Sequence, residues 1–233
     1  MQSAVLPINE IDRLAVLHRS SLLDTEVEKS YDDLVWLTSS ICQTPIALVS
    51  LVDENRQWFK ARVGLDVQET SRDSSFCAHA ILRPDEVMVV PDTLLDERFI
   101  DNPLVIGDPG IRFYAGAPLN TSDGFSLGSL CVIDRVPRVL TEQQQIALRT
   151  LARQASVLIE LRRTLSKLHD ALGEIKLLKG LLPICSSCKN IRDVDGEWSN
   201  MELYIQKHSE AKFSHTICPD CAQRLYPGYY RKK

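Results

Sequence analysis

Four cysteines near the C-terminal end of the chain form the pattern that most strongly indicates chemistry. They make up two Cys-x-x-Cys pairs, Cys185 with Cys188 and Cys218 with Cys221, separated by 29 residues. A Cys-x-x-Cys turn directs both sulfurs to the same side, and two such turns supply the four tetrahedral thiolates that structural zinc prefers. The spacing therefore predicts a structural zinc site. With all four positions filled by protein, the ion would not activate water.

Three other interpretations of these cysteines stay open. His215 lies three residues before Cys218 and could replace one thiolate as a zinc ligand. The four side chains could also be ordinary reduced cysteines. In a third interpretation, oxidation expels the zinc and makes the tail a redox sensor.

The segment around these pairs, residues 183–233, predicts a small module. A hairpin is expected at Asp195-Gly196, a helix over Met201–His208 and a strand over Phe213–Ile217. About 50 residues bury too little apolar surface to be stable alone, so a bound metal would have a clear structural purpose. We expect a zinc-ribbon-like module that presents a surface to a protein partner.

Cys77 and His79 form a second candidate constellation, two residues apart in a segment that predicts a short helix over Phe76–Leu82. A nucleophilic cysteine needs an activating base beside it in a cleft. Positions two apart on a helix lie about 200° apart around its axis, so these side chains diverge. We therefore expect Cys77, like Cys131, to be a small buried apolar residue.

Composition narrows the class of protein. The 233 residues are 44% hydrophobic and 25% charged, with a net charge of −4, which argues against nucleic acid or anionic lipid as a partner. The longest apolar runs, such as Ile46–Val49, are far shorter than the roughly 20 residues of a membrane span. The N-terminal residues lack the basic and apolar regions of a secretory signal. We expect a cytoplasmic protein with no membrane partner.

Residues 1–140 predict an α+β domain. Apolar residues recur at helical spacing over Ile11–Leu23 and again over Asp33–Cys42. Short β-branched runs follow, and turn residues join them into hairpins, most clearly at Ser122-Asp123-Gly124. Helices that flank a hairpin-connected sheet are typical of this class.

Residues 141–182 predict one long helix that connects the two domains. Thr141 and Gln144 fit a capping box at its start. Apolar residues then follow a heptad seam for about four heptads, which predicts a parallel coiled coil and hence a homodimer. The alternative is that the first part, about 143–159, packs on its own domain. The seam positions are Leu151, Leu158, Leu161, Leu165, Leu168, Leu172, Ile175 and Leu182.

Several segments in order, from about Leu14 to Gln154, resemble the GAF domains of bacterial sensory proteins. The resemblance implies a six-stranded antiparallel sheet with flanking helices, a small-molecule pocket over one sheet face, and dimerisation through the terminal helices. The segments that carry it are IALVSLVD (46–53), RQWFKARVG (56–64), SFCAHAIL (75–82), VPDT (90–93), RFIDNP (98–103), IRFYAGAPL (111–119) and GSLCVIDRVP (128–137).

Such a pocket would be lined by the sheet and by the helix above it. We expect ligand contacts from one set of side chains with mostly apolar walls. Asp92 could equally cap the turn that follows it. The expected ligand-binding residues are Phe76, His79, Asp92, Phe113 and Tyr114.

The chain departs from enzymes and photoreceptors that contain GAF domains. It has no kinase, cyclase or phosphate-loop motif, so a non-enzymatic role in signal transduction is expected, with output through a protein partner. Bilin attachment typically uses Cys followed directly by His, whereas Ala78 separates Cys77 from His79. The enzyme alternative is a free methionine sulfoxide reductase or a redox sensor. The segment Asp96–Arg112, where such a reductase carries further cysteines, contains none.

Overall fold

A computed structural model describes residues 2–174, 182–193, 195–209 and 211–227, with the backbone alone for 169–174. The chain divides into two compact units, Met1–Leu168 and His169–Lys233. Within the described residues, no helix combines the length and the apolarity needed to cross a lipid bilayer.

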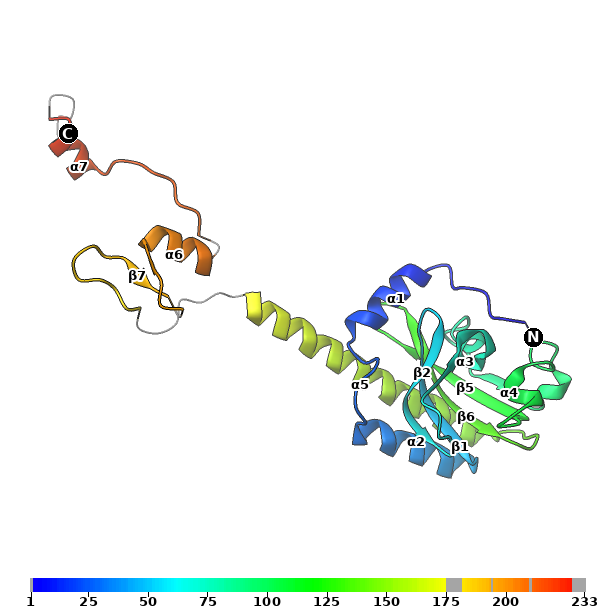
Figure 1. The fold of residues 1–233 in the computed structure, drawn as a ribbon. Helices are drawn as coiled ribbons and strands as arrows, with labels where there is room; N and C mark the ends of the chain where they lie inside the picture. The colour runs from blue at the N-terminus through cyan, green and yellow to red at the C-terminus, as the bar shows by residue number, and fades with distance from the viewer. Residues whose placement is uncertain (1, 175–181, 194, 210, 228–233) are drawn as a thin grey trace. The chain divides into compact units, whose positions relative to one another are not determined.

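The first unit is built on a six-stranded sheet with the order β3-β2-β1-β6-β5-β4, in which every neighbouring pair is antiparallel (Figure 1). The α+β class and the antiparallel GAF-type sheet are thereby confirmed. A β-bulge interrupts the pairing of β1 with β2 between Val49 and Ser50. The strands are β1 (Ile46–Val52), β2 (Arg56–Val63), β3 (Glu69–Ser71), β4 (Met88–Val90), β5 (Phe113–Asn120) and β6 (Ser126–Asp134).

Helices cover both faces of the sheet, and each face has its own apolar core. Three helices, α1 (Glu10–Arg19), α2 (Lys29–Cys42) and the first part of α5 (Glu142–Glu174), pack on one face, which we call the packed face. Two short helices, α3 (Phe76–Ala80) and α4 (Pro103–Ile106), lie over the other, which we call the cavity face. Two 3-10 turns, η1 (Arg72–Ser74) and η2 (Thr93–Leu95), connect these segments.

Helix α5 starts as the sequence predicts. The Gln144 N–H donates to Thr141 Oγ1 at 3.2 Å, and the Thr141 N–H donates back to Gln144 Oε1 at 3.0 Å, so the capping box is confirmed. The helix then contributes four buried side chains to the packed face, which therefore includes part of the predicted connector. These side chains are Leu148, Ala152, Ala155 and Ile159.

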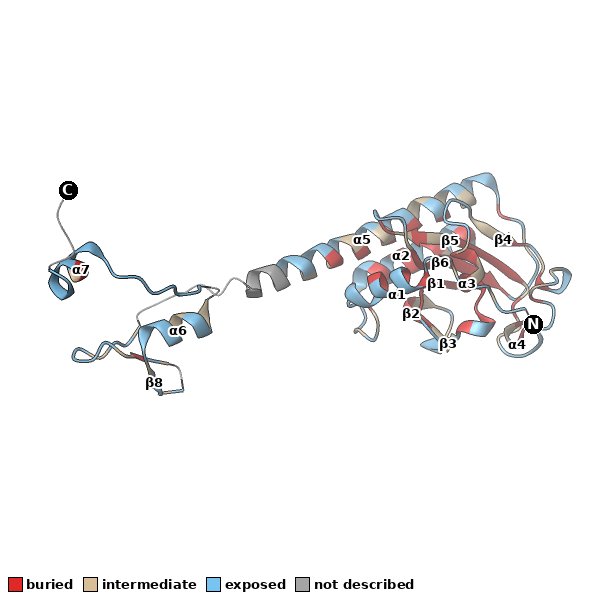
Figure 2. Cartoon of the chain, turned by 90° about the horizontal axis from the view of Figure 1, so that it is seen from above, coloured by how far each residue is buried: buried red, intermediate tan, exposed pale blue. Residues whose placement is uncertain are grey.

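The predicted heptad seam divides into two parts on this helix. Leu151 and Leu158 are partly buried and pack against the domain's own core. Three later positions are more than half exposed: Leu161, Leu165 and Leu168. Figure 2 shows that buried and exposed residues both occur along α5. The side chains of Leu172 and Ile175 lie outside the described residues. Leu182, where the predicted helix was expected to end, is described and is not helical.

The second unit contains a hairpin of β7 (Ile191–Arg192) and β8 (Trp198–Ser199), followed by α6 (Met201–His208) and α7 (Pro219–Leu225). The predicted hairpin and the helix over Met201–His208 are confirmed. Asn200 caps α6 by accepting a hydrogen bond from the Leu203 N–H at 2.7 Å.

The strand predicted over Phe213–Ile217 is wrong. This segment has no regular secondary structure, and Phe213 and Ile217 at its two ends are exposed. The β-branched and aromatic residues suggested a strand, but among the described residues no partner strand pairs with it. A helix that the sequence did not predict, α7, begins two residues later at Pro219, a residue favoured in the first turn of a helix.

Candidate functional site

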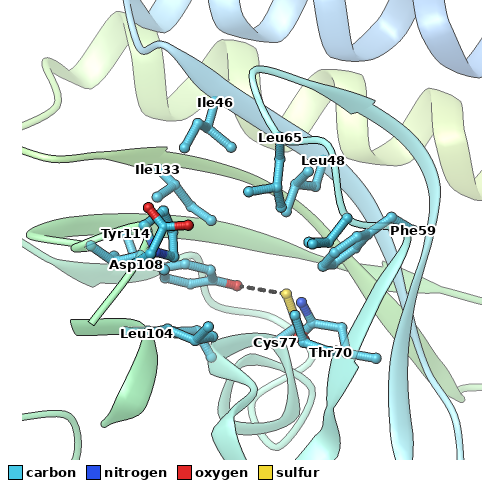
Figure 3. Close-up of a pocket in the computed structure, with 15 residues that line it drawn as sticks. Ile46, Leu48, Phe59, Leu65, Thr70, Cys77, Leu104, Asp108, Tyr114 and Ile133 are labelled. Carbon is cyan, nitrogen blue, oxygen red and sulfur yellow. Dashed lines mark hydrogen bonds between the residues drawn. The ribbon is translucent and has the colours of Figure 1, made fainter. Parts of the chain in front are cut away.

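A cavity of about 130 Å³ lies on the cavity face, between the sheet and the segment that carries α3 and α4 (Figure 3). Its walls are mostly aliphatic and aromatic. Asp108 is the one charged side chain among the described residues that line it. The lining residues are Ile46, Leu48, Gln57, Phe59, Leu65, Val67, Thr70, Phe76, Cys77, Leu104, Asp108, Pro109, Ile111, Tyr114 and Ile133.

Strand alternation explains which sheet residues reach the cavity. Successive side chains on a strand point to opposite faces of the sheet. On β1, Ile46 and Leu48 face the cavity, whereas Ala47 and Val49 belong to the packed face. On β5, Tyr114 faces the cavity.

Helix α3 brings Phe76 and Cys77 to the same cavity. Its N-cap is Ser75, whose hydroxyl oxygen accepts a hydrogen bond from the Ala78 N–H at 3.0 Å while the hydroxyl itself donates to Gln57 on β2. The Phe76 ring stacks on Tyr114, with ring centroids 5.1 Å apart. These contacts fix the short helix over the sheet.

Two thiols meet beside the cavity. Cys77 Sγ lies 3.8 Å from Cys131 Sγ, although the residues are 54 positions apart in the chain. The Tyr114 hydroxyl lies 3.3 Å from Cys77 Sγ, as the dashed line in Figure 3 shows, and 3.2 Å from Ser129 Oγ. The side chains of Cys77, Cys131, Tyr114 and Ser129 are all buried from bulk solvent. Cys77 also lines the cavity. The hydroxyl of Ser50, on the cavity side of β1, has no partner at ordinary hydrogen-bond distance among the described residues, although it also helps to lower the pKa of Cys77.

This environment changes the acidity of the two thiols in opposite directions. Burial by itself raises the pKa of Cys77, but donors from Cys131, Ser129 and Tyr114 outweigh it and lower the pKa to about 7. The pKa of Cys131 is raised well above its usual value because its thiol donates to Cys77 and because it is buried. Cys77 is therefore the thiol of the pair that ionises first.

Of the five residues expected to bind a ligand, Phe76 and Tyr114 line the cavity and three lie elsewhere. Phe113 belongs to the packed face, because it is adjacent to Tyr114 on β5 and strand alternation sends the two side chains to opposite sides. Asp92 caps η2 through the Leu94 N–H and forms an ion pair with Arg112 at 2.8 Å.

His79 lies outside the cavity as well. Its Nε2 is 3.1 Å from the carbonyl oxygen of Gln2, and its ring packs edge-on against Phe99. Burial lowers the pKa of His79. The side chains of Cys77 and His79 diverge, as helix geometry predicts, so His79 does not serve as a base for Cys77.

From the sequence, Cys131 was expected only as a small buried residue, and Ser129 and most of the cavity wall were not identified. The signal for the strand residues was present, because Ser129 and Cys131 alternate with Leu130 and Val132 along β6. The wall supplied by 104–111 comes from a loop and a short helix, for which no periodic pattern exists.

In the second unit, Cys185 and Cys188 lie in a local turn, whereas Cys218 is the N-cap of α7 and Cys221 lies in its first turn. Backbone N–H groups of Cys188 and Ser187 lower the pKa of Cys185, and the backbone N–H of Cys221 lowers that of Cys218. Within the described part of the chain, no three cysteine, histidine or acidic side chains lie close enough together to hold one metal ion.

These features agree with comparisons to known proteins. Residues 11–159 match the sequence profile described as "GAF domain", and the chain belongs to this family. The GAF domain from an Acinetobacter phosphoenolpyruvate-protein phosphotransferase is similar in fold, with a TM-score of 0.51 and 20% identity over 68% of this chain and 97% of that one. The PixJ GAF domain of Thermosynechococcus elongatus matches with a TM-score of 0.51 and 17% identity, over 73% of this chain and 99% of that one.

A stronger sequence relationship links the chain to one protein with a named activity. The cyclic di-GMP phosphodiesterase PA2567 of Pseudomonas aeruginosa is 44% identical over 174 residues. The match covers 74% of this chain but only 30% of that protein's length.

Proposed function

We propose that this GAF domain is the sensory part of a signalling protein and that it binds a small, uncharged, mainly apolar molecule. The observation that carries the proposal is the cavity of about 130 Å³ on the cavity face. Well-packed interiors contain few voids larger than a water molecule, so a cavity of this size beside a sheet is a candidate binding site. An engineered cavity of about 150 Å³ in another protein binds benzene, which sets the scale at roughly one ring.

The lining supports the chemical class. Most of the wall is aliphatic or aromatic, and the lining hydroxyl Thr70 Oγ1 has no hydrogen-bond partner among the described residues. Among the described lining residues there is no cation to pair with a carboxylate or a phosphate. The zwitterion of methionine sulfoxide and the phosphates of a cyclic dinucleotide are therefore poorly matched to this cavity.

We further propose that α5 transmits the state of the domain to an output. Arg163 on α5 is buried and forms a bidentate pair with Asp123 in the turn between β5 and β6, at 2.9 Å for both contacts. The exposed Leu161, Leu165 and Leu168 would form the contact with a second copy. By analogy with its phosphodiesterase relative, the output would belong to cyclic di-GMP signalling, as an attached domain or a separate protein partner.

The C-terminal unit is proposed to be a zinc-stabilised interaction module. Its four thiols, Cys185, Cys188, Cys218 and Cys221, match the donor set of structural zinc, and each pair has backbone N–H groups directed at a sulfur. We expect about one zinc per chain, lost in a Cys185→Ser/Cys218→Ser double variant. Metal analysis of protein purified without added metal tests this, and zinc-free protein with correctly folded C-terminal residues would contradict it.

The ligand proposal is tested by titration with p-cresol, toluene and cyclic di-GMP. We expect p-cresol and toluene to shift the NMR signals of Leu48, Leu104 and Ile133 methyl groups and cyclic di-GMP to leave them unchanged. An Ile133→Phe variant fills the cavity and should lose binding, whereas Ile106→Phe, at an exposed residue outside the lining, should keep it. Binding that persists in Ile133→Phe would contradict the proposed site.

A further inference from the structure

The buried surroundings of Cys77 and Cys131 include several hydroxyl groups. Each sulfur is within 3.8 Å of the other, and Cys77 Sγ also lies 3.3 Å from the Tyr114 hydroxyl. A purely apolar site would not need hydroxyl groups from Tyr114, Ser129 and Ser50 on the same patch, because each costs free energy to bury. Such donors stabilise negative charge on sulfur, and a thiolate is the reactive form of cysteine.

The cavity supplies access to this pair. Cys77 is only 1% exposed but lines the cavity, whereas Cys131 lies behind it and does not. A molecule in the cavity therefore meets Cys77 first. A water-sized, uncharged oxidant such as hydrogen peroxide fits a space of this volume.

We propose that Cys77 and Cys131 form a redox-active dithiol that hydrogen peroxide entering the cavity converts to a disulfide. The Cys77 thiolate attacks one peroxide oxygen, the O–O bond breaks, and the leaving hydroxide takes up the thiol proton as water. The resulting sulfenic acid is then attacked by Cys131 sulfur, which forms the S–S bond, and the second oxygen leaves with the Cys131 proton as water. The two thiols supply both electrons, and the peroxide is reduced to two waters.

The geometry of the pair suits the second step. The sulfurs are in van der Waals contact at 3.8 Å, and a disulfide bond of about 2.05 Å requires an approach of less than 2 Å. Both residues sit on regular elements, Cys77 on α3 and Cys131 on β6. Helix α3 has five residues, whereas β6 has nine and pairs with strands on both sides, so the approach of the sulfurs requires a small shift of α3.

Cys42 shows that burial alone does not make such a site. It is also 1% exposed, but it lies among aliphatic side chains of the packed face, and burial raises its pKa to about 11. It lines none of the cavity. Cys42 is therefore the internal control for the reactivity of Cys77.

The test treats the full chain with hydrogen peroxide, blocks the remaining thiols, and maps disulfides by mass spectrometry without reduction. Trypsin separates the two cysteines, since Cys77 falls in residues 73–98 and Cys131 in residues 113–135. We expect a bridge between these two peptides, while the peptide of Cys42, residues 30–56, stays reduced. If the C-terminal cysteines oxidise and this bridge does not form, the proposal is wrong.

Variants assign the order of the two steps. Cys131→Ser should stop at a Cys77 sulfenic acid that dimedone captures, and Cys77→Ser should leave Cys131 reduced. Tyr114→Phe removes one donor and should raise the pH at which Cys77 is half-alkylated, slowing oxidation by roughly tenfold at neutral pH. Dimedone capture on Cys131 in the Cys77→Ser variant would overturn the assignment of the attacking thiol.

The result is independent of the proposed small-molecule ligand. Bridge formation is measured on protein without p-cresol or toluene, so a failed ligand titration leaves the dithiol proposal standing. A missing bridge likewise leaves the ligand proposal untouched.

Discussion

The two faces of one sheet differ in how they are filled. On the packed face, α1, α2 and the first part of α5 place aliphatic side chains against β1, β5 and β6. On the cavity face, short elements cover the same strands and leave about 130 Å³ unfilled beside two thiols and a tyrosine hydroxyl. Long helices can interlock with a sheet over several turns, whereas α3 and α4, with five and four residues, cannot. The packed face therefore provides stability, and the cavity face is where binding and chemistry are possible.

The largest expected change in the free energy of unfolding comes from truncating a buried leucine on the packed face, compared with truncating one on the cavity face. Leu130→Ala removes a fully buried side chain of the packed face and should lower the free energy of unfolding by about 3–5 kcal/mol. Leu48→Ala extends a cavity that already exists and should cost about 2 kcal/mol, because one side of the Leu48 side chain already faces the cavity. Urea unfolding of both variants measures the difference, and equal costs would break the comparison.

Two adjacent residues of β6, Val132 and Ile133, allow the same larger side chain to be introduced on each face of the sheet. Val132→Phe forces extra volume into the packed face and should cost about 2–3 kcal/mol. Ile133→Phe puts the same ring into the cavity and should change the free energy of unfolding by no more than about 1 kcal/mol. Thermal unfolding of the two proteins separates these outcomes. A larger loss for Ile133→Phe would show that the cavity face is as tightly packed as its opposite.

The smallest expected change in stability comes from the ion pair between Arg163 on α5 and Asp123 in the turn between β5 and β6. Hydrogen bonds from Arg163 lower the pKa of Asp123 below its usual value. A lowered pKa in the folded state contributes stability above the unfolded pKa of about 4, and this contribution is lost as the pH falls below it. Asp123 is 46% exposed, so the contribution should stay below about 1 kcal/mol.

The measurement is urea unfolding of the wild type and of Asp123→Asn at pH 7 and pH 3. At pH 7 the wild type should be slightly more stable than Asp123→Asn, and the difference between the two proteins should be smaller at pH 3. An unchanged difference would mean that the pair does not contribute to the attachment of α5.

Much of the fold could be predicted because local patterns carry it. Helical spacing identified α1 and α2, turn residues identified the hairpins, and Thr141 with Gln144 marked the start of α5. The strand predicted over Phe213–Ile217 failed because composition alone cannot supply a partner strand. The site was predicted less well. Phe76 and Tyr114 line the cavity, but Phe113 was also expected there, although strand alternation sends the side chains of adjacent Phe113 and Tyr114 to opposite faces of the sheet.

The amino-acid sequence by itself determined the class of domain, the alternation of the strands and the cysteine pairs of the C-terminal unit, since each depends on residues close together in the chain. Only the tertiary structure decided that Cys77 and Cys131 touch, because one lies on α3 and the other on β6 with 54 positions between them. It also decided that Leu151 and Leu158 of the heptad seam pack against the domain's own core, since that depends on where α5 meets the sheet. Contacts between distant segments arise from packing, and packing has no signature in local sequence.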